Sequence, residues 1–315
     1  MAAAHESSGP RRFADPAVVV QSWYVAARAR DLPRGGVLRS RPTGRELVLW
    51  RGLDGRVHAA DARCPHLGAH LGHGRVAGDD LVCALHHFRF GSDGALLEAP
   101  GVTSRPSCRV RTFPTTERWG FVWVWQGPRA LHPLPGPATD ERLRVLAFPE
   151  QRFACHHHLI AVNACDTLHL GPLHELELAE APVVTIADDF SATMRLRGRF
   201  KTAWKRRVTG CNRHDFDALF TVSGGNLCWV AVAAPVPFQV IFAGRPDGAT
   251  GSITRSLLFL PPGSTRRVWR VLALLLLLLK RDHDILDDLA FMRGFTDADE
   301  VLATFVRHID AMPVG

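Results

Sequence analysis

The chain has 315 residues, of which 46% are hydrophobic and 22% charged, a balance typical of globular domains that excludes a disordered or fibrous protein. The net charge of +7 favours an acidic partner, but the arginines are scattered and form no basic stripe, so nucleic-acid binding is not indicated. Seven cysteines without a secretory signal favour reduced thiols in a cytoplasmic protein over a disulfide framework.

The first part of the chain predicts an all-β domain over residues 18–130. Residues 1–17 contain no apolar core of a signal peptide, so we expect them to form a flexible tail. Short strand-like runs then follow, among them SWYVAARA, ELVLWRG, GRVHAADA and GFVWVW, separated by Gly, Pro and Asp. The Pro- and Gly-rich segment 127–141 is the expected domain boundary.

The second part, residues 140–315, predicts an antiparallel sheet with a few helices, which gives the chain an α+β fold. Six runs read as strands: CHHHLIAVN, VVTIADD, ATMRLRGRF, LCWVAVAAPV, SITRSLLFLP and VWRVLALLLLLL. Residues 165–180 and 282–292 read as helices. The apolar run 271–279 has nine residues, whereas a membrane span needs about 20, so we expect a buried strand or core segment and no transmembrane helix.

Two short loops of the first domain carry a pattern of metal ligands. Cys64-x-His66 is followed, after sixteen intervening residues, by Cys83-x-x-His86, so each loop offers one sulfur and one nitrogen donor. Four-coordinate zinc would accept this set. A tight Cys-x-His pair is unusual for a structural zinc site, however, and it suits a two-iron cluster in which one iron takes both cysteines and the other both histidines.

The sequence CPHLGAHLGHG...CALHHFRFGSDG resembles the Rieske [2Fe-2S] motif. The resemblance implies that Cys64, His66, Cys83 and His86 hold the cluster. The remaining histidines of the segment do not occupy ligand positions of the motif and are interpreted as loop or hydrogen-bonding residues: His70, His73 and His87. The sequence departs from the family at residues 84–85, where Ala-Leu replaces the usual Pro and aromatic residue.

A second constellation lies in NACDTLHLGPLHE, which contains Asn163, Asp166, His169 and His174. Asp166 and His169 are three residues apart and would share one face of a helix. The following Gly-Pro pair at residues 171–172 is expected to break the regular turn and to let His174 approach the same ion from another angle. Two imidazoles need one carboxylate to complete the facial triad that binds Fe(II).

The third ligand is predicted to be Asp282, chosen from four acids in RDHDILDDLAFM. On a helix, Asp282 falls in the apolar stripe formed by Ile285, Leu286, Leu289 and Met292. An acid in such a stripe is costly unless it is paired or bound to metal. The other three acids are interpreted as a solvated face: Asp284, Asp287 and Asp288.

This second motif resembles the catalytic domain of Rieske non-haem iron oxygenases, as do SWYVAARARDLPRG and RWGFVWVWQG, and the resemblance covers most of the chain. It is closest to the ketosteroid hydroxylase and cholesterol desaturase type. It implies a helix-grip catalytic domain and a homotrimer, in which His86 contacts Asp166 of the adjoining subunit. Asp166 would also hold the second nitrogen of His169, and Asn163 would lie near the iron.

The implied function is that of a terminal oxygenase component, more a monooxygenase than a dioxygenase. It would use O2 and electrons from NAD(P)H, relayed by a ferredoxin and/or a flavin reductase, because the chain has no flavin or nicotinamide motif. Its substrate would be a hydrophobic small molecule, such as a steroid, isoprenoid or polycycle, that is hydroxylated, demethylated, desaturated or cyclised. The alternative is a Rieske electron-transfer or regulatory protein with a non-catalytic second domain.

Other His- and Cys-containing runs are given structural interpretations. CHHHL, residues 155–159, is expected to be a strand that alternates its histidines on a sheet surface. CNRHDFD, residues 211–217, could form another metal site, although a polar loop is favoured. The Phe residues of the second domain, with Trp204 and Trp229, are assigned to the core rather than to a pocket wall.

Overall fold

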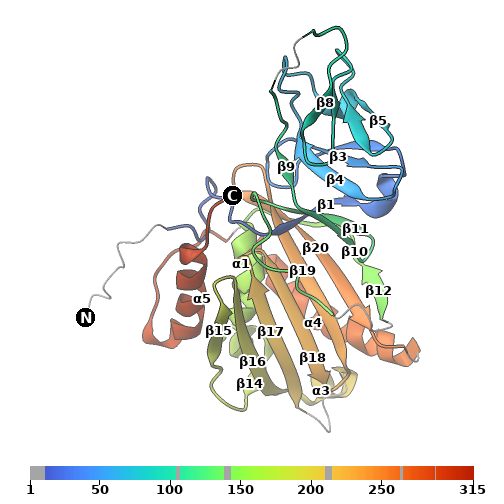
Figure 1. The fold of residues 1–315 in the computed structure, drawn as a ribbon. Helices are drawn as coiled ribbons and strands as arrows, with labels where there is room; N and C mark the ends of the chain where they lie inside the picture. The colour runs from blue at the N-terminus through green and yellow to red at the C-terminus, as the bar shows by residue number, and fades with distance from the viewer. Residues whose placement is uncertain (1–10, 104–106, 138–142, 210–214, 263–264, 288) are drawn as a thin grey trace. The chain divides into compact units, whose positions relative to one another are not determined.

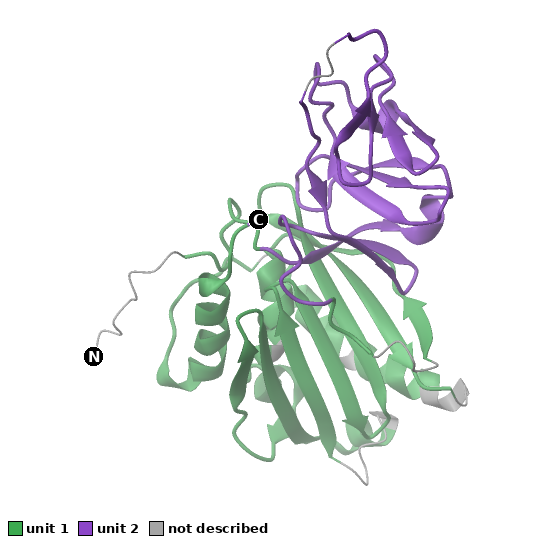
Figure 2. Ribbon diagram, viewed as in Figure 1, with its two compact units in different colours: residues 1–20, 134–314 green, residues 21–133, 315 purple. Residues whose placement is uncertain are grey.

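A computed structural model of the chain describes residues 11–103, 107–137, 143–209, 215–262, 265–287 and 289–315. The chain divides into two compact units, which Figure 2 colours separately. One unit holds residues 21–133 together with Gly315, and the other holds the residues up to Val20 and residues 134–314. The chain passes between the units inside the Pro- and Gly-rich segment 127–141.

The unit of residues 21–133 consists of short antiparallel strands in three described sheets (Figure 1). The first sheet has the order β1 (Trp23–Arg28), β11 (Phe121–Trp125), β10 (Thr115–Arg118). The second has the order β2 (Val37–Ser40), β3 (Leu47–Arg51), β4 (Val57–Asp61), β9 (Thr112–Phe113), and the third β5 (Arg75–Ala77), β6 (Asp80–Val82), β7 (Arg89–Phe90), β8 (Leu96–Glu98). Single 3₁₀ turns lie at Ala29–Asp31 and Leu71–His73.

Strand β3 separates two small cores within this unit. Successive side chains of a strand point to opposite faces, so Leu47 and Leu49 pack into one hydrophobic cluster, and Val48 and Trp50 into the other. The second cluster also contains the two cysteines of the Rieske-like loops. Strand β3 therefore supplies the apolar layer on which those loops rest.

The other unit is one antiparallel sheet of nine described strands with helices packed on it (Figure 1). The main order is β12 (Arg144–Ala147), β20 (Gly251–Leu260), β19 (Phe238–Asp247), β18 (Leu227–Ala234), β17 (Phe216–Ser223), β16 (Ser191–Phe200), β14 (Leu176–Leu178). In addition, β13 (Gln151–Phe153) pairs with β20, and β15 (Val184–Asp188) pairs with β16. Every second residue of β16 from Ala192 onward is buried, as expected for a strand with one face on the core.

The helices of this unit are α1 (His157–Val162), α2 (Leu170–His174), α3 (Ala203–Thr209), α4 (Thr265–Leu286) and α5 (Glu300–Ala311), with 3₁₀ turns at Asn163–Cys165 and Asp297–Asp299. The expected α+β class is confirmed. Among the described helices, none combines the length and the apolar character that a bilayer-spanning helix needs.

The leucine-rich run 271–279 belongs to α4, so the strand interpretation of this segment was wrong. Leucine is a strong helix former, and Val271, Leu274 and Leu275 are buried at helical spacing while Leu276 is exposed. The helix expected over residues 282–292 was right only for residues 282–286, because α4 ends at Leu286. The expected helix over 165–180 is divided into a 3₁₀ turn, α2 and β14.

Residues 11–17, which were expected to belong to a flexible tail, pack against the core of the unit that contains residues 134–314. Phe13 is 4% exposed and meets the rings of His158 and Phe291. The backbone N–H groups of Arg12 and Phe13 both donate to Asp310 Oδ1, at 2.8 Å. Burial and a charged acceptor thus hold this segment in place, whereas residues 1–10 of the expected tail lie outside the described residues.

Candidate metal centres

The four candidate cluster ligands lie on two loops of the small β unit. The first loop follows β4, and the second connects β6 to β7. Both loops are closed by backbone hydrogen bonds, from Gly68 N–H to the Cys64 carbonyl and from His87 N–H to the Cys83 carbonyl. His87 adopts a left-handed φ of 57°, and this conformation tightens the second loop.

The loops place the sulfur donors inward and the imidazoles outward. Cys64 and Cys83 are buried in one hydrophobic cluster, whereas His66 and His86 are exposed. The two imidazole rings lie 4.7 Å apart, and the His66 ring stacks on Phe88 at 4.5 Å. Burial raises the pKa of Cys64 to about 11, so a positive ion at this position is what would favour its thiolate. This is the donor arrangement of a Rieske cluster.

The second candidate centre joins α2 to the last turn of α4. His174 Nε2 lies 2.8 Å from Asp282 Oδ1, and His169 Nε2 lies 3.9 Å from the same oxygen. One ligand atom from each residue lies within 4.8 Å of the other two. Asp284, the neighbouring acid, is exposed. The structure therefore brings together the two histidines and the carboxylate selected from the sequence.

Local backbone geometry orients this group. His169 is the N-cap residue of α2 and His174 its last residue, and Glu175 ends the helix in the left-handed conformation. Gly171 and Pro172 were expected to break the turn, but they lie in the first turn of α2, where proline is tolerated.

Two basic residues that the sequence interpretation missed hold α2 by its carbonyl groups. The Lys205 ammonium donates to the His174 carbonyl, and the guanidinium of Arg281 donates to the Leu173 carbonyl. Arg281 directly precedes Asp282, so this bond fixes α2 against the turn of α4 that carries the carboxylate. No short sequence motif signals either contact, because each joins residues that are distant in the chain.

Asp166 lies behind His169, with its Oδ2 3.4 Å from His169 Nδ1. Burial raises the pKa of Asp166, but hydrogen bonds from His169 and from the N–H of Leu168 outweigh burial and lower the pKa overall. The two residues were expected to share a helix face, yet Asp166 lies in a non-helical turn closed by its own side chain on Leu168 N–H. A carboxylate on the outer nitrogen of a ligating histidine fixes the ring's tautomer and orientation.

The buried polar atoms of this group fit a bound cation. Among the described residues, none forms a hydrogen bond with Asp282 Oδ1 or with His174 Nδ1. A buried carboxylate oxygen without a donor is costly, and a cation between the three side chains would offset that cost. Two imidazoles and one carboxylate are the donor set of mononuclear non-haem Fe(II) sites with open positions.

The triad lines part of an apolar cavity between the sheet and α4, which we call the inner cavity. Its wall includes Asn163, Phe200, Phe238 and Leu275. The expectation that the Phe residues of this unit serve the core alone was therefore wrong for several of them. The assignment of Trp204 to the core was also wrong, because its side chain is exposed. Such a cavity binds hydrophobic small molecules and excludes water.

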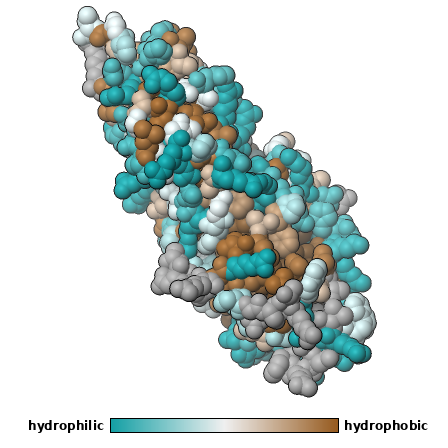
Figure 3. All heavy atoms as spheres, turned by 90° about the vertical axis from the view of Figure 1, so that its right-hand side faces the viewer, coloured by the Kyte–Doolittle hydropathy of each residue, from teal (hydrophilic) through white to brown (hydrophobic). Residues whose placement is uncertain are grey.

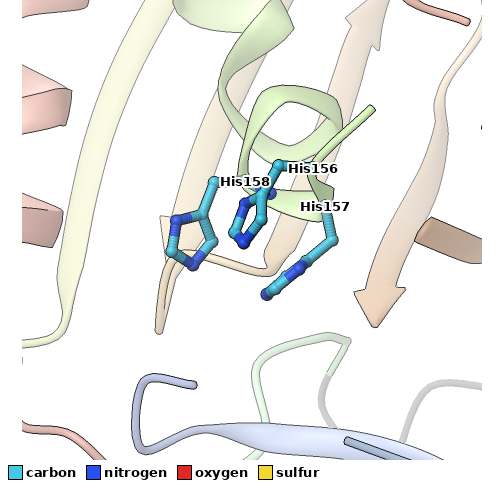
Figure 4. A group of neighbouring side chains, drawn as sticks. All are labelled: His156, His157 and His158. Carbon is cyan, nitrogen blue, oxygen red and sulfur yellow. The ribbon is translucent and has the colours of Figure 1, made fainter. Parts of the chain in front are cut away.

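The three consecutive histidines, His156, His157 and His158, are buried at the start of α1 (Figure 4). The expectation of a strand with surface histidines was wrong. His156 Nδ1 caps the helix by accepting the N–H of His158, and His158 Nδ1 accepts the N–H of Ala14. One nitrogen from each ring lies within 4.8 Å of the others. Because two of the rings accept backbone hydrogen bonds, we interpret this cluster as a structural anchor for residues 11–17.

The remaining histidines of the cluster loops have local contacts. His70 caps the turn Leu71–His73 by accepting the N–H of Gly72, and His73 contacts Arg39. Of the segment 211–217, which was weighed as another metal site, residues 211–214 lie outside the described residues.

Comparison with known proteins identifies the domain that carries the first centre. The family model of the Rieske [2Fe-2S] domain matches residues 22–114. The chain is 39% identical over 176 residues to aminopyrrolnitrin oxygenase PrnD of Pseudomonas fluorescens, and the alignment covers 50% of this chain and 47% of that protein. It is 34% identical over 157 residues to 4beta-methylsterol monooxygenase of Methylococcus capsulatus, and the alignment covers 47% of this chain and 42% of that protein. The chain thus spans about half the length of these relatives.

Solved structures extend the likeness to the whole fold. Dicamba monooxygenase bound to dicamba aligns with a TM-score of 0.68 over 92% of this chain and 96% of that chain, at 20% identity. NdmB of Pseudomonas putida CBB5 aligns with a TM-score of 0.70 over 91% of this chain and 89% of that chain, at 16% identity. The chain therefore contains a Rieske [2Fe-2S] domain, and its fold is that of dicamba monooxygenase. The two sequence relatives are named as an oxygenase and a monooxygenase.

Proposed function

We propose that the chain is the terminal component of a Rieske non-haem iron oxygenase that acts as a monooxygenase on a hydrophobic small molecule. The observation that carries the proposal is the meeting of His169, His174 and Asp282 in the wall of an apolar cavity, in a chain that also has a Rieske domain. Relatives named for a methylsterol and for cholesterol support a steroid, isoprenoid or polycyclic substrate.

In this proposal each group of residues has a separate task. Cys64, Cys83, His66 and His86 would hold the [2Fe-2S] cluster, which when bound supplies single electrons. His169, His174 and Asp282 would hold Fe(II), which when bound supplies dioxygen activation for the oxidation of carbon. The apolar wall of the inner cavity orients the substrate and keeps water away from the reacting carbon.

We further propose that the electron passes between subunits of a homotrimer, from His86 of one chain to Asp166 of its neighbour. His86 is exposed, and the Asp166 side chain is 34% exposed, so the side chains of both are accessible to a second chain. Asp166 would then link an incoming imidazole to His169. Asn163 borders the inner cavity beside the triad and is proposed as a further polar contact near the iron.

The electron donor is proposed to be an acidic ferredoxin or a flavin reductase that draws on NAD(P)H. The net charge of +7 would attract such a partner over a range of about 10 Å at moderate salt. Reduction of the cluster by an acidic ferredoxin should therefore slow as the ionic strength rises; a rate independent of salt would contradict electrostatic docking. The free thiols of the described cysteines are consistent with a cytoplasmic location, which we include in the proposal.

An electron-transfer or regulatory role without catalysis is less well supported. Such a protein would not need a carboxylate oxygen that is buried without a hydrogen-bond donor and faces two histidines, nor an apolar cavity beside them. The two functions differ in oxygen consumption. The reduced chain, supplied with electrons and a panel of hydrophobic compounds, should consume O2 and release an oxidised product. Cluster reduction without substrate-dependent O2 uptake by any compound would favour the alternative.

A further inference from the structure

A second cavity, which we call the outer cavity, lies along α4 next to the inner one. It is lined by Trp269 and Leu276, whose side chains are 67% and 70% exposed. Apolar residues gather on the side of the molecule where α4 lies in Figure 1, as Figure 3 shows. The two cavities share wall residues, among them Gln151, Leu279 and His283. The shared wall marks a junction between the surface and the triad.

Polar atoms without partners gather at this junction. Thr254 is 1% exposed and lines the inner cavity, and Ser256 is 4% exposed and lines the outer cavity. The two residues are separated by one position on β20, so their side chains share a face of the sheet. Among the described residues, neither hydroxyl has a hydrogen-bond partner, and the same holds for His283 Nδ1.

Neighbouring residues extend this polar group. Gln151 stands directly opposite Thr254 in the β13–β20 pairing, and it lines both cavities. Its cross-strand position places its amide on the same face as the Thr254 hydroxyl. The His283 ring packs edge-on against Phe153, with ring centroids 4.6 Å apart, which fixes its orientation at the junction.

We propose that Thr254, Ser256 and His283, with Gln151, form a polar subsite for one neutral oxygen function, a hydroxyl or carbonyl, of an otherwise apolar substrate. This inference rests on the proposed function. Buried hydroxyls without partners are costly, and a substrate oxygen at the junction would satisfy them. Because the inner cavity is apolar, the substrate's hydrocarbon body would extend toward the triad while its oxygen stays at the junction.

The subsite selects a neutral group rather than an anion. Within the described part of the wall, no lysine or arginine lines the inner cavity, and Lys280 lines the outer cavity alone. Hydroxyl and amide groups both donate and accept, so they suit either an alcohol or a ketone. A carboxylate at this position would lack a cationic partner and would keep its desolvation cost.

The test is calorimetric binding to the full chain with both iron centres loaded and without reductant. The probes are three compounds of matched shape: 2-naphthol, 2-methylnaphthalene and 2-naphthoate. We expect 2-naphthol to bind about tenfold more tightly than 2-methylnaphthalene, and 2-naphthoate to gain nothing over the hydrocarbon. Equal binding of naphthol and hydrocarbon by the wild-type chain, or a preference for the carboxylate, would overturn the inference.

The near-isosteric double variant Thr254→Val, Ser256→Ala should reduce the tenfold preference to about twofold or less, with the affinity for 2-methylnaphthalene unchanged. Thr221→Val, on β17 and outside both cavity walls, is the matched control and should keep the preference. A preference retained by the double variant would contradict the assignment. If the double variant does not fold, Thr254→Val alone serves. Binding is measured without turnover, so its result does not depend on oxygenase activity. If the wild-type chain prefers 2-naphthol but the reduced chain shows no O2 uptake in the separate activity assay, the proposed function is contradicted and the subsite is retained.

Discussion

Asp282 supplies the charge that distinguishes the proposed iron site from a simple pair of buried histidines. Its Oδ1 faces both imidazoles and has no hydrogen-bond donor among the described residues. We therefore expect Asp282→Ala to lose the mononuclear iron, since two imidazoles alone make a poor Fe(II) site. Iron content per chain should fall by about one, and the absorption of the Rieske cluster should be unchanged.

Asp284→Ala is the matched control for this experiment, because Asp284 lies on the same helix and is exposed. It should keep the full iron content. Oxygenase activity that survives in Asp282→Ala but is lost in Asp284→Ala would show that the wrong carboxylate had been assigned.

His156 makes stability depend on pH. Burial lowers the pKa of His156 to about 4, with Asp15 opposing that shift, and His157 and His158 are buried beside it. A histidine with a lowered pKa in the folded state contributes stability above its unfolded pKa, near 6.5, and this contribution is lost as the pH falls toward 4. For His156 alone the loss amounts to about 3 kcal/mol.

His156→Asn keeps an acceptor at the helix N-cap and removes the titrating ring. Urea unfolding at pH 7.5 and pH 5 should show a smaller loss of unfolding free energy in this variant than in the wild-type chain. An identical loss in both proteins would mean that other groups cause the acid sensitivity.

Helix α4 is held on the sheet by the buried face of its leucine-rich run. Leu274 is 2% exposed in the main core, whereas Leu276, two residues on, is exposed. Leu274→Ala should lower the free energy of unfolding by about 2–5 kcal/mol, because it leaves a cavity. Leu276→Ala removes the same atoms from the surface and should change it by less than about 0.5 kcal/mol. Similar losses for both variants would contradict the described helix face.

Periodicity alone could not distinguish helix from strand in this run, because an unbroken row of leucines fits both patterns. Strands with alternating burial, such as β16, could be predicted from local sequence, because alternation fits a strand and not a helix. The stripe used to select Asp282 was partly misjudged, since Ile285 and Met292 are exposed and α4 ends between them. Asp282 is nevertheless enclosed, because α2 packs on this turn of α4 and Arg281 holds it there.

Electron transfer between subunits depends on Asp166 in the proposed trimer. Asp166→Asn keeps the size of the side chain and removes its charge. We expect both iron centres to be retained, while product formation falls by about tenfold or more and reoxidation of the reduced cluster slows. The measurement is single-turnover oxidation of the pre-reduced chain. Wild-type rates in this variant would exclude Asp166 as the connector.

The four cluster ligands and the pair His169 and His174 could be predicted because they lie in compact motifs, whereas Asp282 lies far along the chain and was selected from its position on a helix. The inner cavity could not be predicted, since its wall combines β16, β18, β19 and α4, whose association depends on tertiary packing. The polar group of Thr254, Ser256 and His283 was hidden for the same reason. Serine and threonine in a strand are unremarkable until their lack of partners is seen.

The central claim, two different iron centres in one chain, is tested most directly by counting iron and cluster on the same purified sample. We predict about three irons per chain, of which two belong to a cluster with the Rieske spectrum and one is lost on mild chelation while that spectrum persists. Two irons per chain after anaerobic loading with Fe(II), all of them in the cluster, would contradict the account.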